Sequence, residues 1–204
     1  MPVQQTIPFN EGTFFITFTC YNWLPLIHKT DSYDIIYNWF DHINSKWHKI
    51  NGFVIMPNHV HALISFKSIG QSINTIIGNG KRFMAYEIIK RLKTNNELDL
   101  LNTLKENVEA ARKVHHKIHE VWELSFDWKL CSSINFTKQK LNYMHDNPCS
   151  GKWNLCNSPI NYIHSSAKHY LAGEDGDIYC YRCRRGLIMF RFNSNLLIDG
   201  AERP

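Results

Sequence analysis

One segment, residues 52–66, constrains the fold more than any other part of this 204-residue chain; it reads Gly-Phe-Val-Ile-Met-Pro-Asn-His-Val-His-Ala-Leu-Ile-Ser-Phe. Its first run, residues 53–56, is continuously apolar, and the run that begins at His59 alternates in pattern. Pro57 fixes its own φ angle and Asn58 tolerates an unusual one, so the residues between the runs favour a tight turn. The segment therefore predicts two neighbouring β-strands joined by a turn.

Side chains of the second run point alternately to opposite faces of its strand. Val60, Ala62, Ile64 and Phe66 share the face that we expect to pack on the core, and His59, His61, Leu63 and Ser65 share the other. Two imidazoles side by side suit one metal ion held between two neutral nitrogens. On spacing alone, two surface or hydrogen-bonded histidines are the better interpretation, because the chain has 11 histidines.

A second string lies far downstream, residues 140–148, and reads Lys-Leu-Asn-Tyr-Met-His-Asp-Asn-Pro. It belongs to a predicted helix over residues 135–146, which Pro148 ends because proline disfavours α geometry at the residue before it. Helical residues four apart lie on one face, so Tyr143 and Asn147 share a side of this helix.

Taken together, the Met-Pro-Asn-His-Val-His string and the Tyr-x-x-x-Asn-Pro string resemble the HUH-type single-tyrosine transposases, and among them most closely the REP-associated tyrosine transposases. The resemblance runs from about residue 12 to about residue 170. It implies that Tyr143 is the catalytic nucleophile and that His59, His61 and Asn147 bind the metal. This mixed nitrogen and oxygen ligand set suits Mg²⁺ or Mn²⁺. The implied activity is DNA nicking and strand transfer through a 5′-phosphotyrosine, on single-stranded or hairpin DNA.

The remaining elements predict an α+β fold. Strands are expected over residues 12–20 and 126–131, and helices over residues 31–47, 72–93 and 135–146, by their alternating or three- and four-residue apolar spacing. The order β-α-β-β-α-β fits the ferredoxin-like fold of the family, an antiparallel sheet with helices on one face, followed by a C-terminal tyrosine-bearing helix. The histidine face of the sheet is then expected to be open to DNA and to that helix.

Basic residues gather on the helix predicted over residues 72–93. Lys81, Arg82, Lys90 and Arg91 are expected to contact DNA phosphates, and Lys140 of the tyrosine helix is a further candidate. The alternative is a solvated helix face, which is the usual place for such charges. A basic helix also follows the HUH strand in the family, which favours DNA contact. Gly78 and Gly80 weaken the helix, so close approach to another element is expected there.

The length and composition predict one domain, residues 1–173, with a helical insertion at about 95–118 and a tail at 174–204. The net charge of +5 is compatible with a nucleic-acid partner without requiring one. No apolar run reaches membrane-spanning length, and six scattered cysteines favour a reducing cytoplasm, with nucleoid association for a DNA-binding protein. The resemblance allows a monomer or a homodimer.

Two other functions remain open from the sequence. The same fold could serve as a DNA-binding or repressor protein with little cleavage. A zinc hydrolase could use His59 and His61 with water as its nucleophile. Of the three functions, the transposase alone predicts a covalent protein–DNA adduct.

Overall fold

A computed structural model of the chain describes residues 6–106, 108, 118–124, 126–151 and 153–171. Its strands are β1 (Gly12–Thr19), β2 (Lys49–Ile55), β3 (His59–Phe66) and β4 (Asp127–Leu130). The α-helices are α1 (Leu26–Lys29), α2 (Tyr33–Ser45), α3 (Ile73–Thr94), α4 (Leu98–Glu106), α6 (Ile134–Asp146) and α7 (Ala167–Leu171). Short 3₁₀ helices are η1 (Tyr21–Trp23), η2 (Asn147–Cys149) and η3 (Pro159–Asn161).

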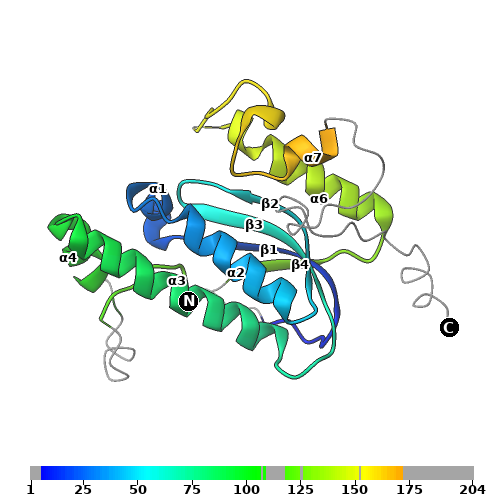
Figure 1. Cartoon of the computed structure of the whole chain (residues 1–204), viewed down its shortest axis with the longest axis horizontal. Helices are drawn as coiled ribbons and strands as arrows, with labels where there is room; N and C mark the ends of the chain where they lie inside the picture. The colour runs from blue at the N-terminus through cyan, green and yellow to red at the C-terminus, as the bar shows by residue number, and fades with distance from the viewer. Residues whose placement is uncertain (1–5, 107, 109–117, 125, 152, 172–204) are drawn as a thin grey trace.

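The four strands form one sheet in the order β2-β3-β1-β4, and each neighbouring pair is antiparallel. Helices α2 and α3 cover one face of this sheet, while α6 and α7 lie over the other (Figure 1). This order and this placement of the two crossover helices confirm the predicted ferredoxin-like α+β fold. The helix with Tyr143 lies on the face that α2 and α3 leave uncovered.

The main core lies between the sheet and helices α2 and α3. Val60, Ala62, Ile64 and Phe66 point into it, as the alternation in the sequence predicts, together with Phe14, Ile16 and Phe18 of β1. Gly80 permits the two helices to cross closely, because a Cβ atom there would collide with the indole of Trp39 on α2. The close approach expected at this glycine is therefore confirmed, whereas Gly78 has no neighbour near its missing Cβ.

Helix α2 is shorter at both ends than the periodicity of the sequence predicts. Asp31 and Trp47 have φ angles of 48° and 67°, in the left-handed region that a helix excludes. Trp47 is 74% exposed, so it does not extend the buried stripe of α2. The spacing of an apolar residue alone did not reveal that the chain leaves the helix before reaching it.

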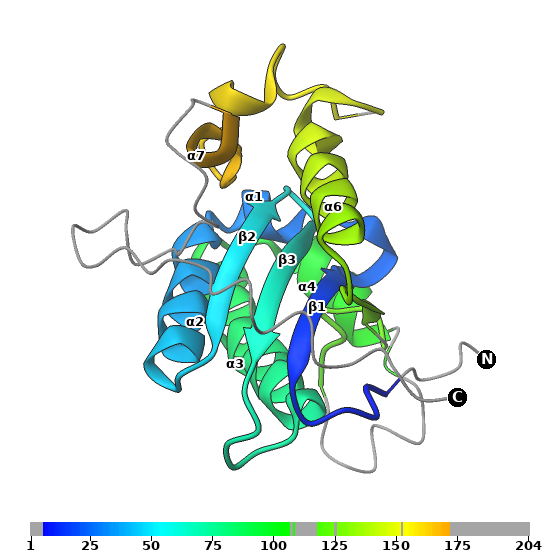
Figure 2. The ribbon, with the colours of Figure 1, turned by 90° about the vertical axis from the view of Figure 1, so that its right-hand side faces the viewer.

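The second, smaller core lies on the opposite face of the sheet. Figure 2 shows α6 on that side of the strands. Leu141 and Met144 of α6 pack there against Phe15, Val54 and Leu63 of the strands. This packing fixes the height and rotation of α6 above β1, β2 and β3.

Gly52 of β2 makes that close packing possible, because an added Cβ would lie 2.6 Å from Leu141 Cδ2. The edge of β2 is covered by the segment before α7: Ile55 N donates to His164 O at 2.8 Å, and Ser166 N donates to Phe53 O at 2.9 Å. The site face of the sheet is therefore held by contacts from two distant segments.

Helix α4 lies within the predicted insertion at 95–118, of which residues 107 and 109–117 fall outside the described residues. The predicted tail, 174–204, also lies outside them. Within the described part of the chain, no helix combines the length and the apolar character needed to span a membrane.

Candidate active site

His59 and His61 lie at the start of β3, and their ring centroids are 4.8 Å apart. Both side chains point to the α6 face, as predicted, and the register with β1 places them opposite Thr19 and Thr17 respectively. They are only 4% and 5% exposed. The tyrosine-bearing helix α6 lies over this face, as predicted, but the two histidine side chains are more deeply buried than an open face implies.

His61 contacts a group through each of its ring nitrogens. Its Nδ1 shares a 2.6 Å hydrogen bond with Thr17 Oγ1, and its Nε2 lies 3.5 Å from Asn147 Nδ2. Burial, the neighbouring His59 and the charge of Lys140 hold the pKa of His61 well below its usual value. The imidazole is therefore neutral at pH 7, the form in which histidine binds metals.

His59 is oriented by Asn58, whose side chain is completely buried. Asn58 Nδ2 donates to Trp23 O at 2.9 Å, so its Oδ1 is the end that faces His59 Nδ1 at 2.7 Å. That oxygen accepts the proton of Nδ1, which leaves the lone pair of the imidazole on Nε2. The φ angle of Asn58 does not lie in the left-handed region. Asn58 therefore contributes to the turn through its side chain rather than through an unusual φ.

Tyr143 lies on α6 and is 53% exposed, whereas Leu141, Met144 and His145 of the same helix are buried. Its ring centroid lies 5.4 Å from that of His61 and 6.0 Å from that of Phe15, edge-on in both cases. Leu141 and Met144 anchor the helix to the sheet, so the tyrosine is held on its outer side. The hydroxyl-bearing ring and the histidine pair are therefore neighbours.

Asn147 is the residue after the last turn of α6, and its backbone stays helical (φ −55°, ψ −43°) despite the following Pro148. This geometry keeps the side chain on the Tyr143 side, in contact with His61. Lys140 lies one turn before Tyr143, with its Nζ 5.6 Å from the tyrosine ring and 5.3 Å from the ring of Phe15. The structure thus brings five of the predicted site residues together: His59, His61, Lys140, Tyr143 and Asn147.

The donor set fits a hard or borderline divalent cation. Nδ1 of each histidine is engaged by a neighbour, so Nε2 is the nitrogen through which each ring would bind a cation. The two ends of the Asn147 amide are nearly equal in shape, and a half-turn of the amide brings its oxygen to the position near His61. Among the described residues, no group of three or more histidine, cysteine, aspartate or glutamate side chains forms a metal cluster.

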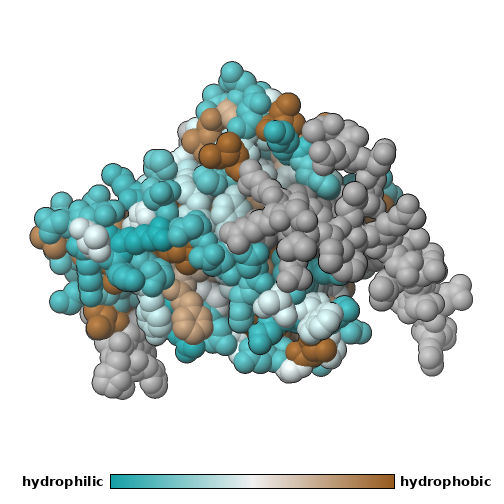
Figure 3. All heavy atoms as spheres, viewed as in Figure 1, coloured by the Kyte–Doolittle hydropathy of each residue, from teal (hydrophilic) through white to brown (hydrophobic). Residues whose placement is uncertain are grey.

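The basic residues of α3 lie across the sheet from the histidine pair. Lys81 Nζ donates to Glu123 O at 2.9 Å, and the Arg91 guanidinium binds both carboxylate oxygens of Asp34 at 2.9 and 2.7 Å. This pairing lowers the pKa of Asp34 and raises that of Arg91. Arg82 and Lys90 are the more accessible of the four predicted contacts, and the surface over α3 and α4 is largely hydrophilic (Figure 3).

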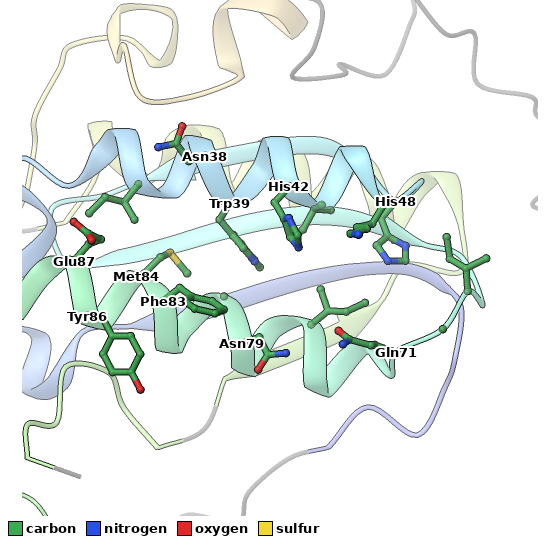
Figure 4. A pocket seen from close by; sticks show the side chains of 17 residues that line it. Asn38, Trp39, His42, His48, Gln71, Asn79, Phe83, Met84, Tyr86 and Glu87 are labelled. Atoms are coloured by element: carbon green, nitrogen blue, oxygen red, sulfur yellow. The ribbon is translucent and has the colours of Figure 1, made fainter. Parts of the chain in front are cut away.

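A groove of about 860 Å³ separates α2 from α3 (Figure 4). Trp39 and His42 of α2 and Asn79, Phe83 and Met84 of α3 contribute to its lining. None of the predicted site residues lines it. The groove therefore belongs to the face of the molecule opposite the histidine pair.

Several residues of the site were not predicted from the sequence. Thr17, Phe15 and Asn58 contact the two histidines, and His145 of α6 forms a buried 2.9 Å hydrogen bond with Ser166 Oγ. Burial lowers the pKa of His145 to about 4. Thr17 could have been found from the alternation of β1, which places it on the same face as Phe15, but its pairing with His61 depends on the strand register.

No protein-family model and no curated protein matches this chain. A solved structure of the REP-associated tyrosine transposase, bound to a REP hairpin, is similar to it with a TM-score of 0.55 and 14% sequence identity. The likeness covers 88% of this chain and 94% of that one, and it shows that the two share a fold. A solved structure of a proposed transposase from Deinococcus radiodurans R1 is similar with a TM-score of 0.39 and 10% identity, over 72% of this chain and 97% of that one.

Proposed function

We propose that this chain is a transposase that uses Tyr143 to cleave and rejoin single-stranded or hairpin DNA with the help of a divalent cation. The observation that carries the proposal is the position of the Tyr143 ring, 5.4 Å from His61 on the face that also bears His59. The fold shared with a tyrosine transposase bound to a REP hairpin supports both the activity and the class of DNA.

In the proposed reaction, the Tyr143 oxygen attacks a backbone phosphorus and loses its proton to solvent. The bond from phosphorus to the 3′-oxygen breaks, and that oxygen takes up a proton and leaves as a free 3′-hydroxyl. The phosphate stays on Tyr143 and on the 5′ end of the other fragment. One phosphodiester replaces another, so the reverse step joins strands without an external energy source.

His59, His61 and Asn147 are the residues that would hold Mg²⁺ or Mn²⁺, and Mn²⁺ accepts imidazole more readily. A bound cation would neutralise the charge that develops on the phosphate, which helps a phenol, a weak nucleophile at neutral pH, to react. Lys140 would contact the same phosphate, because its Nζ lies 5.6 Å from the Tyr143 ring. Thr17 and Asn58 would hold the two imidazoles in the orientation that cation binding needs.

We also propose that Tyr143 acts in cis, within a domain spanning residues 1–173. The tyrosine and His61 are neighbours within one chain, which supports action without a second copy. The insertion at 95–118 and the tail at 174–204 would then be additions to this domain.

We propose a cytoplasmic, nucleoid-associated location, because DNA is the proposed substrate.

Covalent trapping tests the proposal. Hairpin-flanked single-stranded DNA incubated with the protein and Mn²⁺ should give an adduct that survives a denaturing gel. Tyr143→Phe removes only the attacking oxygen from a half-exposed ring, so it should fold, bind DNA and form no adduct. Tyr162→Phe is the matched control. The Tyr162 hydroxyl donates to Ile55 O at 2.8 Å and burial raises its pKa, so this tyrosine is a poor nucleophile. The control variant should therefore still form the adduct.

Each alternative function predicts a different outcome. A repressor of this fold would bind DNA without forming an adduct in the wild-type chain. A zinc hydrolase would cleave with water, so its cleavage would survive Tyr143→Phe. Undiminished cleavage by that variant would move the assignment to the hydrolase.

A further inference from the structure

Trp23 is a large apolar side chain held at the surface beside the histidine pair. It is the last residue of η1, which follows β1 after Cys20, and it is 54% exposed. Its ring centroid lies 5.7 Å from that of His59. A single exposed tryptophan needs no explanation in general, so the argument depends on how this one is held.

The backbone at Trp23 adopts a conformation that side-chain-bearing residues disfavour. Asn22 and Trp23 have consecutive φ angles of 48° and 57°. Two such residues in a row persist only where their surroundings fix them, and strained positions of this kind cluster at functional sites. Here the strain turns the chain so that the indole stays near His59.

Hydrogen bonds fix the strained turn on both sides. Tyr21 N donates to Val121 O at 2.8 Å, and Asn22 N donates to Glu123 Oε1 at 2.7 Å. Trp23 N and Leu24 N donate to carbonyls within the turn, each at 3.0 Å. The position of the indole is therefore set before any ligand binds.

Asn58 connects this turn directly to the histidines. Its buried amide donates to Trp23 O at 2.9 Å and accepts from His59 Nδ1 at 2.7 Å. One side chain thus sets the position of Trp23 relative to His59. Trp23, His59, His61 and Tyr143 follow one another at centroid separations of 5.7, 4.8 and 5.4 Å. Two exposed aromatic rings flank the two buried imidazoles.

We propose that Trp23 is a stacking platform for one unpaired base of the DNA strand whose phosphate lies at the histidine pair. This inference rests on the proposed function and names what the site requires of its substrate. A base can lie flat on an indole only when it is free of its own neighbours, so the platform selects single-stranded DNA at this position. Stacking tolerates every base, because each has a π-face, so Trp23 fixes the position of the strand without reading its sequence.

An abasic scan tests the platform. Binding is measured by fluorescence anisotropy with Tyr143→Phe protein and no added divalent cation, on oligonucleotides that each lack one base. One missing base should weaken binding about tenfold, the range expected for a stacked base. Trp23→Ala in the same protein should weaken binding to intact DNA by the same factor, and should add no further loss on the oligonucleotide lacking that base. Trp23→Phe should retain part of the affinity.

Trp47→Ala is the matched control. Trp47 is 74% exposed and precedes β2 at the end of the sheet opposite His59, by the pairing of Lys49 with Ser65. Its removal should leave every affinity unchanged. Losses from Trp23→Ala and from the abasic site that simply multiply would overturn the proposal, as would Trp23→Ala affinities equal to those of the control.

The outcome is separable from that of the proposed function. Covalent trapping with the intact tyrosine reports on the chemistry, while the abasic scan reports on base stacking without cleavage. If the wild-type chain forms no adduct but the Tyr143→Phe protein shows the coupled loss, the stacking platform is supported and the transposase proposal fails. If the adduct forms but the losses from Trp23→Ala and from the missing base are not coupled, the transposase proposal stands and the platform fails. If the chain binds no single-stranded DNA, both proposals fail.

Discussion

Thr17 forms a hydrogen bond with His61 that its place in the sequence alone would not suggest. Its hydroxyl lies 2.6 Å from His61 Nδ1, across the pairing of β1 with β3. A partner on the second nitrogen of a ligating histidine fixes the ring and raises its basicity. Thr17 is therefore expected to act on a cation through His61.

Thr17→Val should weaken Mn²⁺ binding by about 10–100-fold, the usual cost of removing such a partner. The measurement is a calorimetric titration of Mn²⁺ into the purified chain. Thr13→Val is the control, because Thr13 lies on the same strand and face but bonds Ser65 Oγ at 2.8 Å. Equal Mn²⁺ affinities for the two variants would remove Thr17 from the site.

Gly52 determines how closely α6 can approach the sheet. A Cβ atom at this position would lie 2.6 Å from Leu141 Cδ2, and Leu141 is buried against the strands. Because α6 carries Tyr143 and Asn147, its height above β2 also sets their distance from His61. One glycine in an edge strand therefore bears on the geometry of the site.

Gly52→Ala should lower the free energy of unfolding by about 1–3 kcal/mol, the usual cost of overpacking. It should also reduce adduct formation more than the loss of folded protein explains. Gly78→Ala offers the opposite case, since no atom beyond its chain neighbours and the backbone of α3 itself lies within 4 Å of its missing Cβ. That change should stabilise the chain by about 0.5–1 kcal/mol in urea unfolding. A neutral Gly52→Ala would mean that α6 moves freely on the sheet.

The expected DNA contact of helix α3 is tested separately from the site, because α3 lies on the opposite face of the sheet from the histidines. If α3 contacts DNA backbone, Arg82→Glu and Lys90→Glu should weaken binding to all sequences and flatten its salt dependence, by about one unit of slope for each phosphate that the variant no longer neutralises. Lys105→Glu on α4 is the control for a general loss of positive charge. A slope equal to that of the control would return α3 to a solvated helix face.

In the whole molecule, the main core lies on the α2 and α3 face of the sheet, and the candidate site lies on the α6 face. Alternation and helical spacing predicted this fold well: β1, α3 and α6 begin and end within one residue of the expected positions. Those patterns are local, so local sequence reveals them. The sequence motifs around His59 and Tyr143 predicted the candidate site residues, and the structure places these residues close together.

What the sequence could not supply is set by contacts between distant segments. The partnership of Thr17 with His61 depends on strand register, and the close packing of Leu141 of α6 on β2 depends on the missing Cβ of Gly52. The double role of Asn58 needs Trp23 and His59 at once, and these three residues meet only after folding. Each of these features is a consequence of tertiary packing rather than of local pattern.

The most direct test of the central claim is to locate the DNA on the protein. Trypsin cleavage after Lys140 and Lys152 releases residues 141–152, a peptide whose single tyrosine is Tyr143, whereas Tyr162 falls in the next peptide, residues 153–168. After reaction with Mn²⁺ and nuclease trimming, mass spectrometry should find a 5′-linked nucleotide phosphate on the first peptide. A nucleotide on the second peptide, or cleaved DNA with both peptides unmodified, would contradict the account.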